Sequence, residues 1–298
     1  MQPTTTNPHS NATLAQYETC TVHSKDGTSI GYRKLGRGPG LVLVHGAMES
    51  AASHMQLAEA LAEAFSVYLL DRRGRGLSGP YGPDFGARSE VEDLQALLTA
   101  TDAHFVFGVS AGGLICLEAA LALPAIRKIA LYEPVLSIDN SVSTSFVTRL
   151  DAELAQGRTS AALVTGMQGA QMGPAVFNLL PRWLLETLTN TAMKSEDQKA
   201  APGDVTMRAL APTLHYDFQL VIETRDTVEN YRTICADVLL LGGSQSPAYL
   251  KTALDALHKV FPHAERIEFP GVGHGASGNT ERGGKPDLVA RELLHFFA

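Results

Sequence analysis

The run His104-Phe105-Val106-Phe107-Gly108-Val109-Ser110-Ala111-Gly112 decides the fold of this chain of 298 residues. Residues 104–107 are typical of a buried strand, and residues 113–123 are typical of a helix. A G-x-S-x-G pattern between a strand and a helix predicts a tight turn that exposes the serine hydroxyl at the end of a sheet. The nearby helix N-terminus favours a developing anion. Ser110 is therefore the predicted nucleophile; the alternative is a glycine-rich turn that carries a solvated serine.

On both sides of this turn, patterns typical of strands alternate with patterns typical of helices. We expect strands at 19–23, 30–34, 41–44, 67–70, 104–107, 128–132, 238–241 and 266–269. We expect helices at about 54–65, 90–101, 113–123, 249–260 and 287–297. The first two strands form a hairpin, and the later alternation predicts an α/β fold with a mostly parallel, doubly wound sheet.

The alternation stops in the middle of the chain. From about Pro134 to Thr233 the sequence is typical of helices and loops, without a convincing buried strand. We interpret residues 134–233 as a helical cap over the carboxyl edge of a core made of residues 19–133 and 234–298. Residues 1–18 are polar, lack the pattern of a secretory signal and are expected to form a mobile tail.

Composition narrows the classes of partner. The net charge is −7 and the basic residues form no stripe, so nucleic acid is excluded as a partner. No stretch is apolar and long enough to span a membrane. The cysteines Cys20, Cys116 and Cys235 are far apart and odd in number, which favours reduced thiols in a cytoplasmic protein and no metal site. Cys116 is expected to pack in the core, and the oligomeric state stays open between monomer and homodimer.

A serine hydroxyl needs a base to accept its proton, and that base is usually a histidine oriented by a carboxylate. The candidate is His274, in the glycine-rich loop Pro270-Gly271-Val272-Gly273-His274-Gly275 that follows the last expected strand. This position lets the imidazole reach the edge of the sheet where Ser110 is expected. The alternative interpretation of His274 is a surface histidine in a loop.

Four motifs together resemble the α/β-hydrolase superfamily. They are His45-Gly46, Asp71-Arg72-Arg73-Gly74-Arg75-Gly76, Gly108-Val109-Ser110-Ala111-Gly112 and Gly273-His274. The similarity covers about residues 19–298, with the cap as the least diagnostic part, and it implies the α/β-hydrolase fold.

The resemblance also implies an oxyanion hole made of two backbone N–H groups, those of Ala111 and of Ala47, with Met48 close by. His45 is expected to brace that loop. Asp71 is expected to tie down backbone and to form ion pairs with the arginines next to it.

The acid departs from the common family pattern. Many members place an aspartate after the strand that corresponds to 238–241, where this chain has Gly242-Gly243-Ser244-Gln245-Ser246-Pro247. Glu133, at the end of the strand that follows the helix after Ser110, is the assigned acid. Certain haloalkane dehalogenases and zearalenone-lactonase-like hydrolases carry a glutamate at this place. Asp139 is the reserve candidate, and the alternative role of Glu133 is to hydrogen-bond the backbone at the cap hinge.

The cap supplies apolar side chains that suit a hydrophobic substrate, methionines among them. We expect Trp183, the single tryptophan, to form a wall of the pocket, together with Met48 from the core. Few cap positions offer a fixed cation, which argues against strongly anionic substrates.

These inferences predict a cofactor-independent serine hydrolase that cleaves an ester or lactone of a small hydrophobic molecule through an acyl-enzyme on Ser110. Enzymes of this fold that displace halide or open epoxides need a carboxylate nucleophile, which this chain lacks at position 110. A lyase that cleaves a C–C bond or a cyanohydrin on the same scaffold stays an alternative. A non-catalytic small-molecule receptor is the other.

Overall fold

The computed structural model describes residues 17–173, 177 and 179–298. The N-terminal tail expected over residues 1–18 lies outside the described residues except for Tyr17 and Glu18, and Glu18 already begins the first strand.

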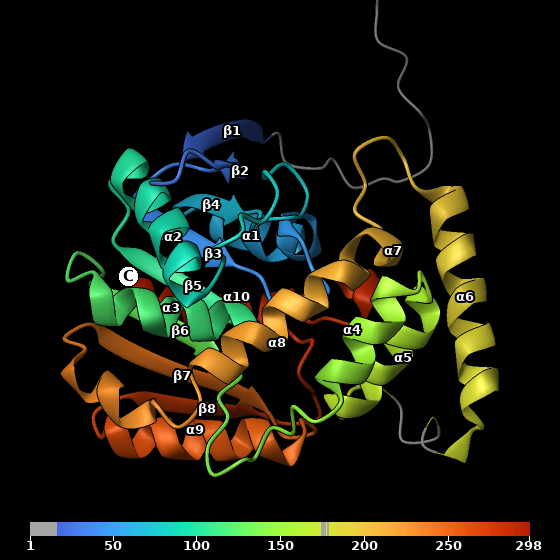
Figure 1. The fold of residues 1–298 in the computed structure, drawn as a ribbon. Helices are drawn as coiled ribbons and strands as arrows, with labels where there is room; N and C mark the ends of the chain where they lie inside the picture. Colours follow the sequence, from blue (N-terminus) through green and yellow to red (C-terminus); the bar gives the residue numbers. More distant parts are fainter. Residues whose placement is uncertain (1–16, 174–176, 178) are drawn as a thin grey trace, which may run out of the picture.

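The strands of the described residues form one sheet of eight, in the order β1-β2-β4-β3-β5-β6-β7-β8 (Figure 1). They are β1 (Glu18–His23), β2 (Ser29–Leu35), β3 (Gly40–Val44), β4 (Ser66–Leu70), β5 (Phe105–Val109), β6 (Lys128–Tyr132), β7 (Asp237–Gly243) and β8 (Glu265–Phe269). Strand β2 pairs antiparallel with both of its neighbours, and the strands from β4 to β8 pair in parallel. This topology confirms the predicted mostly parallel, doubly wound α/β sheet.

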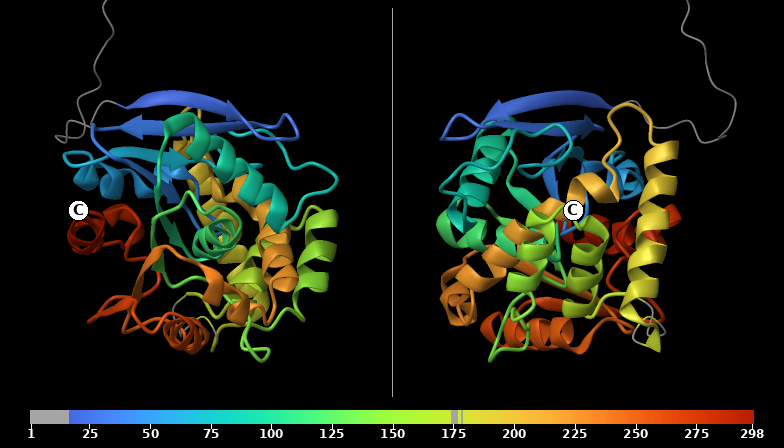
Figure 2. Two further views of the ribbon diagram at one scale, coloured as in Figure 1. Left: turned by 90° about the vertical axis from the view of Figure 1, so that its left-hand side faces the viewer. Right: turned by 45° about the vertical axis from the view of Figure 1, so that its right-hand side comes forward.

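Helices cover both faces of the sheet (Figure 2). One face packs against α1 (Met55–Leu61) and α10 (Pro286–Phe297), and the other packs against α2 (Ala87–Thr101), α3 (Ala111–Ala122) and α9 (Ala248–Val260). The strands are therefore apolar on both faces, as a parallel sheet between two helical layers requires. In β3, for example, Leu41 and Leu43 face the first layer while Val42 and Val44 face the second.

The bounds of the helices differ from expectation mainly at one place. The helix expected over about 54–65 begins with a 3-10 turn, η1 (Ala51–His54), and its α-helical part ends at Leu61. The four residues up to Phe65 turn tightly so that the chain can enter β4, and the N–H of Phe65 bonds to the carbonyl of Leu61.

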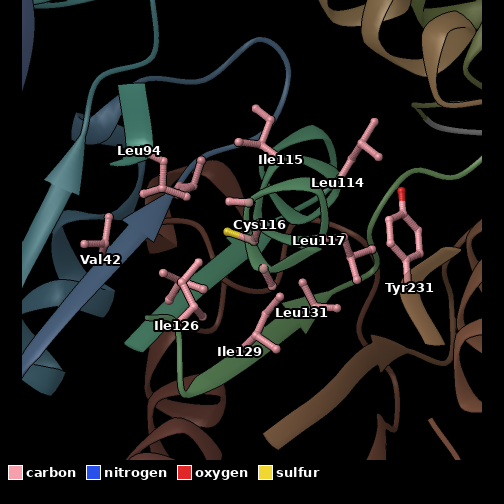
Figure 3. Packing of buried hydrophobic residues seen from close by; sticks show 14 of the residues in the cluster. Val42, Leu94, Leu114, Ile115, Cys116, Leu117, Ile126, Ile129, Leu131 and Tyr231 are labelled. Carbon is pink, nitrogen blue, oxygen red and sulfur yellow. The ribbon is translucent and has the colours of Figure 1, made fainter. Parts of the chain in front are cut away.

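Helix α3 is the most deeply buried helix next to the site. Figure 3 shows its side chains Leu114, Ile115 and Leu117 in one cluster with Ile129 and Leu131 of β6. Cys116 belongs to the same cluster and is fully buried, which confirms its expected role in core packing. Because buried side chains of α3 pack against β6, the first residue of the helix, directly after Ser110, has a fixed position.

The segment between β6 and β7 contains helices and no strand among its described residues. Its helices are α4 (Val147–Ala155), α5 (Thr159–Gly169), α6 (Arg182–Lys199), α7 (Met207–Leu210) and α8 (Leu214–Glu223). They lie together at one side of the sheet (Figure 1) and share a small apolar core that includes Leu150, Met193 and Phe218. None of the helices in the described part of the chain has the length and hydropathy needed to cross a membrane.

Candidate active site

The carboxyl ends of four parallel strands, β3, β5, β6 and β8, bring the predicted site residues to one edge of the sheet. Ser110 follows β5, Glu133 follows β6, His274 lies after β8, and the loop that contains Ala47 follows β3. In open parallel sheets this edge is the place where ligands bind.

Ser110 adopts a backbone conformation that is rare outside glycine, with φ 55° and ψ −121°. Three bonds hold it there: its N–H donates to the carbonyl of Tyr132 at 3.0 Å, and its carbonyl accepts the N–H groups of Leu114 at 3.1 Å and of Val135 at 3.2 Å. The turn also needs a glycine at position 112, because a Cβ there would clash with the carbonyl oxygen of Val44. A non-glycine residue that is held in such a strained backbone conformation is typical of a functional site.

Glu133 and His274 face each other directly. Oε2 of Glu133 lies 2.7 Å from Nδ1 of His274, and Oε1 accepts the N–H of Gly243 at 2.7 Å. Since a carboxylate accepts, Nδ1 of His274 carries a proton and Nε2 is left as the acceptor. Glu133 is fully buried, and Tyr132 donates its hydroxyl to the carbonyl of Gly273 at 2.8 Å, next to the imidazole.

Asp139, the reserve candidate for the acid, lies elsewhere. It is exposed, and its N–H donates to Oδ1 of Asp226 at 2.8 Å. Among the described residues, the carboxylate that contacts His274 is that of Glu133.

The loop after β3 presents the other backbone groups of the site. No hydrogen bond within the described part of the chain uses the N–H of Ala47 or of Ala111. His45 braces the loop as expected: its Nδ1 lies 2.9 Å from the carbonyl of Gly46, and its Nε2 accepts the N–H of Arg72 at 3.2 Å. Burial, and then the charges of Arg75 and Arg72, hold the pKa of His45 well below its usual range, so the ring is neutral.

A second polar pair near Ser110 was not found by sequence reasoning. Oε2 of Glu49 accepts the N–H of Gly46 at 2.8 Å and lies 3.0 Å from Nε2 of His54. Burial alone would raise the pKa of Glu49, but the charge and hydrogen bond of His54 hold it far below its usual range. Burial likewise disfavours the charged form of His54, but Glu49 outweighs it and raises the pKa. The two groups therefore form a largely buried carboxylate–histidine pair in which each partner favours the charged form of the other.

The Asp71 loop is structural as expected, but its ion pairs differ from the expected ones. Asp71 pairs with Arg33 of β2 at 2.9 Å and accepts the N–H of Ala51 at 2.8 Å. The neighbouring arginines point to other carboxylates: Arg72 and Arg75 both reach Asp217 of α8, at 2.9 and 2.7 Å.

A cavity of about 570 Å³ joins the sheet edge to the helices between β6 and β7. Its polar wall contains Ser110, His274, Glu49, Asp217 and Arg282. Its apolar wall contains Met48 and Ala47 from the core, with Leu163, Met167, Met172, Phe177, Leu185, Leu188, Met207, Leu214 and Phe218 from the segment between β6 and β7. Met48 thus lies where it was predicted. Arg282, a cation outside the helical segment, was missed.

The prediction for Trp183 was wrong. Its side chain is 68% exposed, and it lies outside the lining of the cavity. Helix α6 turns Leu185, Leu188 and Ala192 toward the cavity, and Trp183 lies about 200° around the helix from Leu185 at about 100° per residue. Within the described residues no group of three or more His, Cys, Asp or Glu side chains is arranged to hold a metal ion.

Comparisons with known proteins identify the family of the chain. Residues 41–292 match the family model described as the alpha/beta hydrolase family. The chain is 26% identical over 270 residues to a pimeloyl-[acyl-carrier protein] methyl ester esterase of Xanthomonas axonopodis pv. citri, covering 89% of this chain and 97% of that one. It is 35% identical over 107 residues to N-formylmaleamate deformylase of Pseudomonas putida, covering 34% of this chain and 40% of that one.

Solved structures give the same result. An alpha/beta hydrolase from Sphaerobacter thermophilus superimposes with a TM-score of 0.74 at 33% identity, covering 94% of this chain and 100% of that one. Naproxen esterase from Bacillus subtilis superimposes with a TM-score of 0.63, covering 95% of this chain and 92% of that one. At 17% identity the second match supports the fold alone.

Proposed function

The chain belongs to the alpha/beta hydrolase family, and on that premise we propose that it is a serine hydrolase that cleaves a carboxylic ester or lactone of a small hydrophobic molecule. The observation that carries the proposal is the shared cavity wall of Ser110 and His274, with Glu133 bonded to the far nitrogen of the imidazole. Ester cleavage is also supported by the relatives, one of which is named as a methyl ester esterase.

The proposed reaction is acyl transfer through Ser110. The serine Oγ attacks the carbonyl carbon while Nε2 of His274 accepts its proton, and Glu133 stabilises the imidazolium. The N–H groups of Ala47 and Ala111 donate to the oxyanion of the tetrahedral intermediate. The bond to the alkoxide then breaks and His274 protonates the leaving oxygen. Water, deprotonated by His274, releases the acid from Ser110 by the same steps in reverse.

The cavity wall supports the hydrophobic substrate class. Apart from the groups at the reaction centre, the lining consists mainly of Leu, Met, Phe and Ala side chains. A wall of this kind favours an apolar acyl or alcohol group, since its transfer from water gains roughly 0.8 kcal/mol per buried methylene. Arg282, an exposed cation in the cavity wall, would pair with a polar or anionic group carried by the same substrate.

We also propose that the enzyme works without a cofactor, on a free small molecule in the cytoplasm, as a monomer or homodimer, with no nucleic-acid or membrane partner. Cys20, Cys116 and Cys235 are free thiols, the state that the cytoplasm maintains.

The test is hydrolysis of a panel of p-nitrophenyl esters and γ- and δ-lactones of increasing chain length, with S110A as the control. We expect turnover that rises with chain length and that S110A abolishes. Cleavage of a cyanohydrin or C–C bond by the wild type, with no ester or lactone turned over, would favour the lyase. Ligand binding that S110A leaves unchanged, with no turnover of any compound, would favour the receptor.

A further inference from the structure

The loop that supplies one proposed oxyanion donor has a conformation that must be held from outside. Met48 has φ 54°, in the left-handed region that is unfavourable for a non-glycine residue. Ala47, whose N–H is the proposed donor, comes directly before this strained residue. A loop of this kind keeps its donor aimed only if surrounding contacts fix it.

Glu49 supplies one of these contacts from inside the loop. Its Oε2 accepts the N–H of Gly46, the residue before the proposed donor, at 2.8 Å. The same oxygen and Cβ of Ser110 both lie against Gly46, because a Cβ on Gly46 would lie 3.1 Å from the first and 3.0 Å from the second, and both residues line the cavity. The hydrogen bond between Gly46 and Glu49 therefore joins the two ends of this loop, next to Ser110 in the cavity wall.

His54 connects this carboxylate to the loop that carries the base. Its Nε2 lies 3.0 Å from Oε2 of Glu49, and its Nδ1 lies 2.9 Å from the carbonyl of Ser277, three residues after His274. A carbonyl only accepts, so Nδ1 carries a proton, and Nε2 donates to the carboxylate. The side chain of His54 is 4% exposed, so the imidazole is shielded from water.

Two further contacts join the same two loops. Arg282 donates to the carbonyl of Met48 at 3.2 Å, and the N–H of Asn279 donates to the carbonyl of Ser53 at 2.9 Å. The second of these bonds is accepted by the residue directly before His54. The Glu49–His54 pair is thus part of a connection between the loop with the proposed oxyanion donor and the loop with His274.

We propose that Glu49 and His54 are a positioning pair that sets the N–H of Ala47 relative to Ser110 and His274. The pair acts through the two loops and does not exchange protons with the substrate. This inference rests on the proposed function, because it assigns the pair a role in forming the oxyanion hole of the same site.

The test compares the wild type with E49Q and H54Q on p-nitrophenyl butyrate, with turnover divided by the number of sites that a fluorophosphonate titrates. The E49Q substitution removes the charge, and the side-chain amide in H54Q cannot make both bonds of the imidazole. We expect kcat per titrated site to fall by roughly tenfold to a hundredfold, as a small misplacement of a catalytic group does, with KM within about threefold.

A second readout separates positioning from structural damage. A trifluoromethyl ketone forms a tetrahedral adduct with serine whose oxyanion occupies the hole. Its inhibition constant should rise by the same factor as kcat/KM falls. The double variant E49Q/H54Q should lose no more than the larger single loss, because the two residues act as one unit. If E49Q does not fold, the comparison of H54Q with the wild type still tests the positioning role.

D151N is the matched control. Asp151 forms a carboxylate–imidazole pair with His215 at 2.8 Å, but both side chains are more than a third exposed and lie outside the cavity wall. We expect D151N to keep the wild-type kcat. The inference is overturned if E49Q and H54Q keep kcat per titrated site within about twofold, or if their losses add in the double variant. A wild type that the fluorophosphonate does not label would instead overturn the proposed function.

Discussion

Three non-glycine residues with positive φ gather around the site: Met48 at 54°, Ser110 at 55° and Glu133 at 46°. Each follows the end of a parallel strand within four residues, where the chain must turn away from the sheet. A strained backbone costs about 1–3 kcal/mol per residue and persists only where surrounding contacts fix it. These conformations place Ser110 in the wall of the cavity and the carboxylate of Glu133 against the imidazole of His274.

At the residue scale, the assignment of Glu133 predicts the effect of E133Q. The amide introduced by this substitution still accepts the N–H of Gly243 with its oxygen, but it turns its N–H₂ group toward Nδ1 of His274. That group forces the proton to Nε2, so the ring can no longer accept the proton of Ser110. We expect kcat to fall by about 10⁴ while the protein stays folded, measured by ester hydrolysis and circular dichroism.

D139N is the control for this substitution. Asp139 is exposed and contacts Asp226 through its backbone, so D139N should keep wild-type turnover. Near-normal turnover in E133Q, or a large loss in D139N, would move the role of the acid away from Glu133.

At the scale of elements, the helices between β6 and β7 determine which acyl chains enter. Met167 of α5 lies in the apolar wall of the cavity and is half-buried. M167W should fill part of the cavity and exclude long chains by roughly tenfold or more in kcat/KM, while short esters change by less than about threefold. A series of p-nitrophenyl esters from acetate to decanoate measures this shift.

The matched control is W183A, because Trp183 is large, lies on the next helix and is outside the cavity wall. It should reproduce the wild-type chain-length profile. If M167W also reproduces that profile, the helices do not form the acyl-binding wall.

Among these elements, the strands can be predicted from the sequence, whereas the orientation of a helix depends on its packing. Strands such as β3 and β6 are continuous apolar runs. The carboxyl ends of β5, β6 and β8 place Ser110, Glu133 and His274 at one edge of the sheet by topology alone. The orientation of α6 is different, because its apolar residues lie on several faces and tertiary packing decides which face meets the cavity. Trp183 was misplaced for this reason. The Glu49–His54 pair was missed because its bond to Ser277 joins residues 223 positions apart.

At the scale of the whole molecule, buried charges connect the helices between β6 and β7 to the sheet. Asp217 of α8 accepts from Arg72 at 2.9 Å and from Arg75 at 2.7 Å, and all three side chains are almost fully buried. Removing one partner of a buried pair leaves the other charges without compensation, which costs about 3–5 kcal/mol. The segment therefore cannot move away from the core without exposing these arginines.

This connection predicts a large stability loss in D217N. We expect a decrease in Tm on the order of 10 °C, measured by differential scanning calorimetry. D197N is the control, because Asp197 and Arg208 form a pair of similar length, 2.8 Å, in an exposed position. A D217N protein that melts with the wild type would show that the buried charges do not hold the two parts together.

The central claim is that Ser110 is an activated nucleophile, and labelling with a fluorophosphonate tests it most directly. The modified peptide is located by mass spectrometry in the wild type and in S110A. The account predicts a single adduct on Ser110 that is absent from S110A. An unlabelled wild type, with a probe small enough to enter the 570 Å³ cavity, or an adduct on another serine, would contradict it.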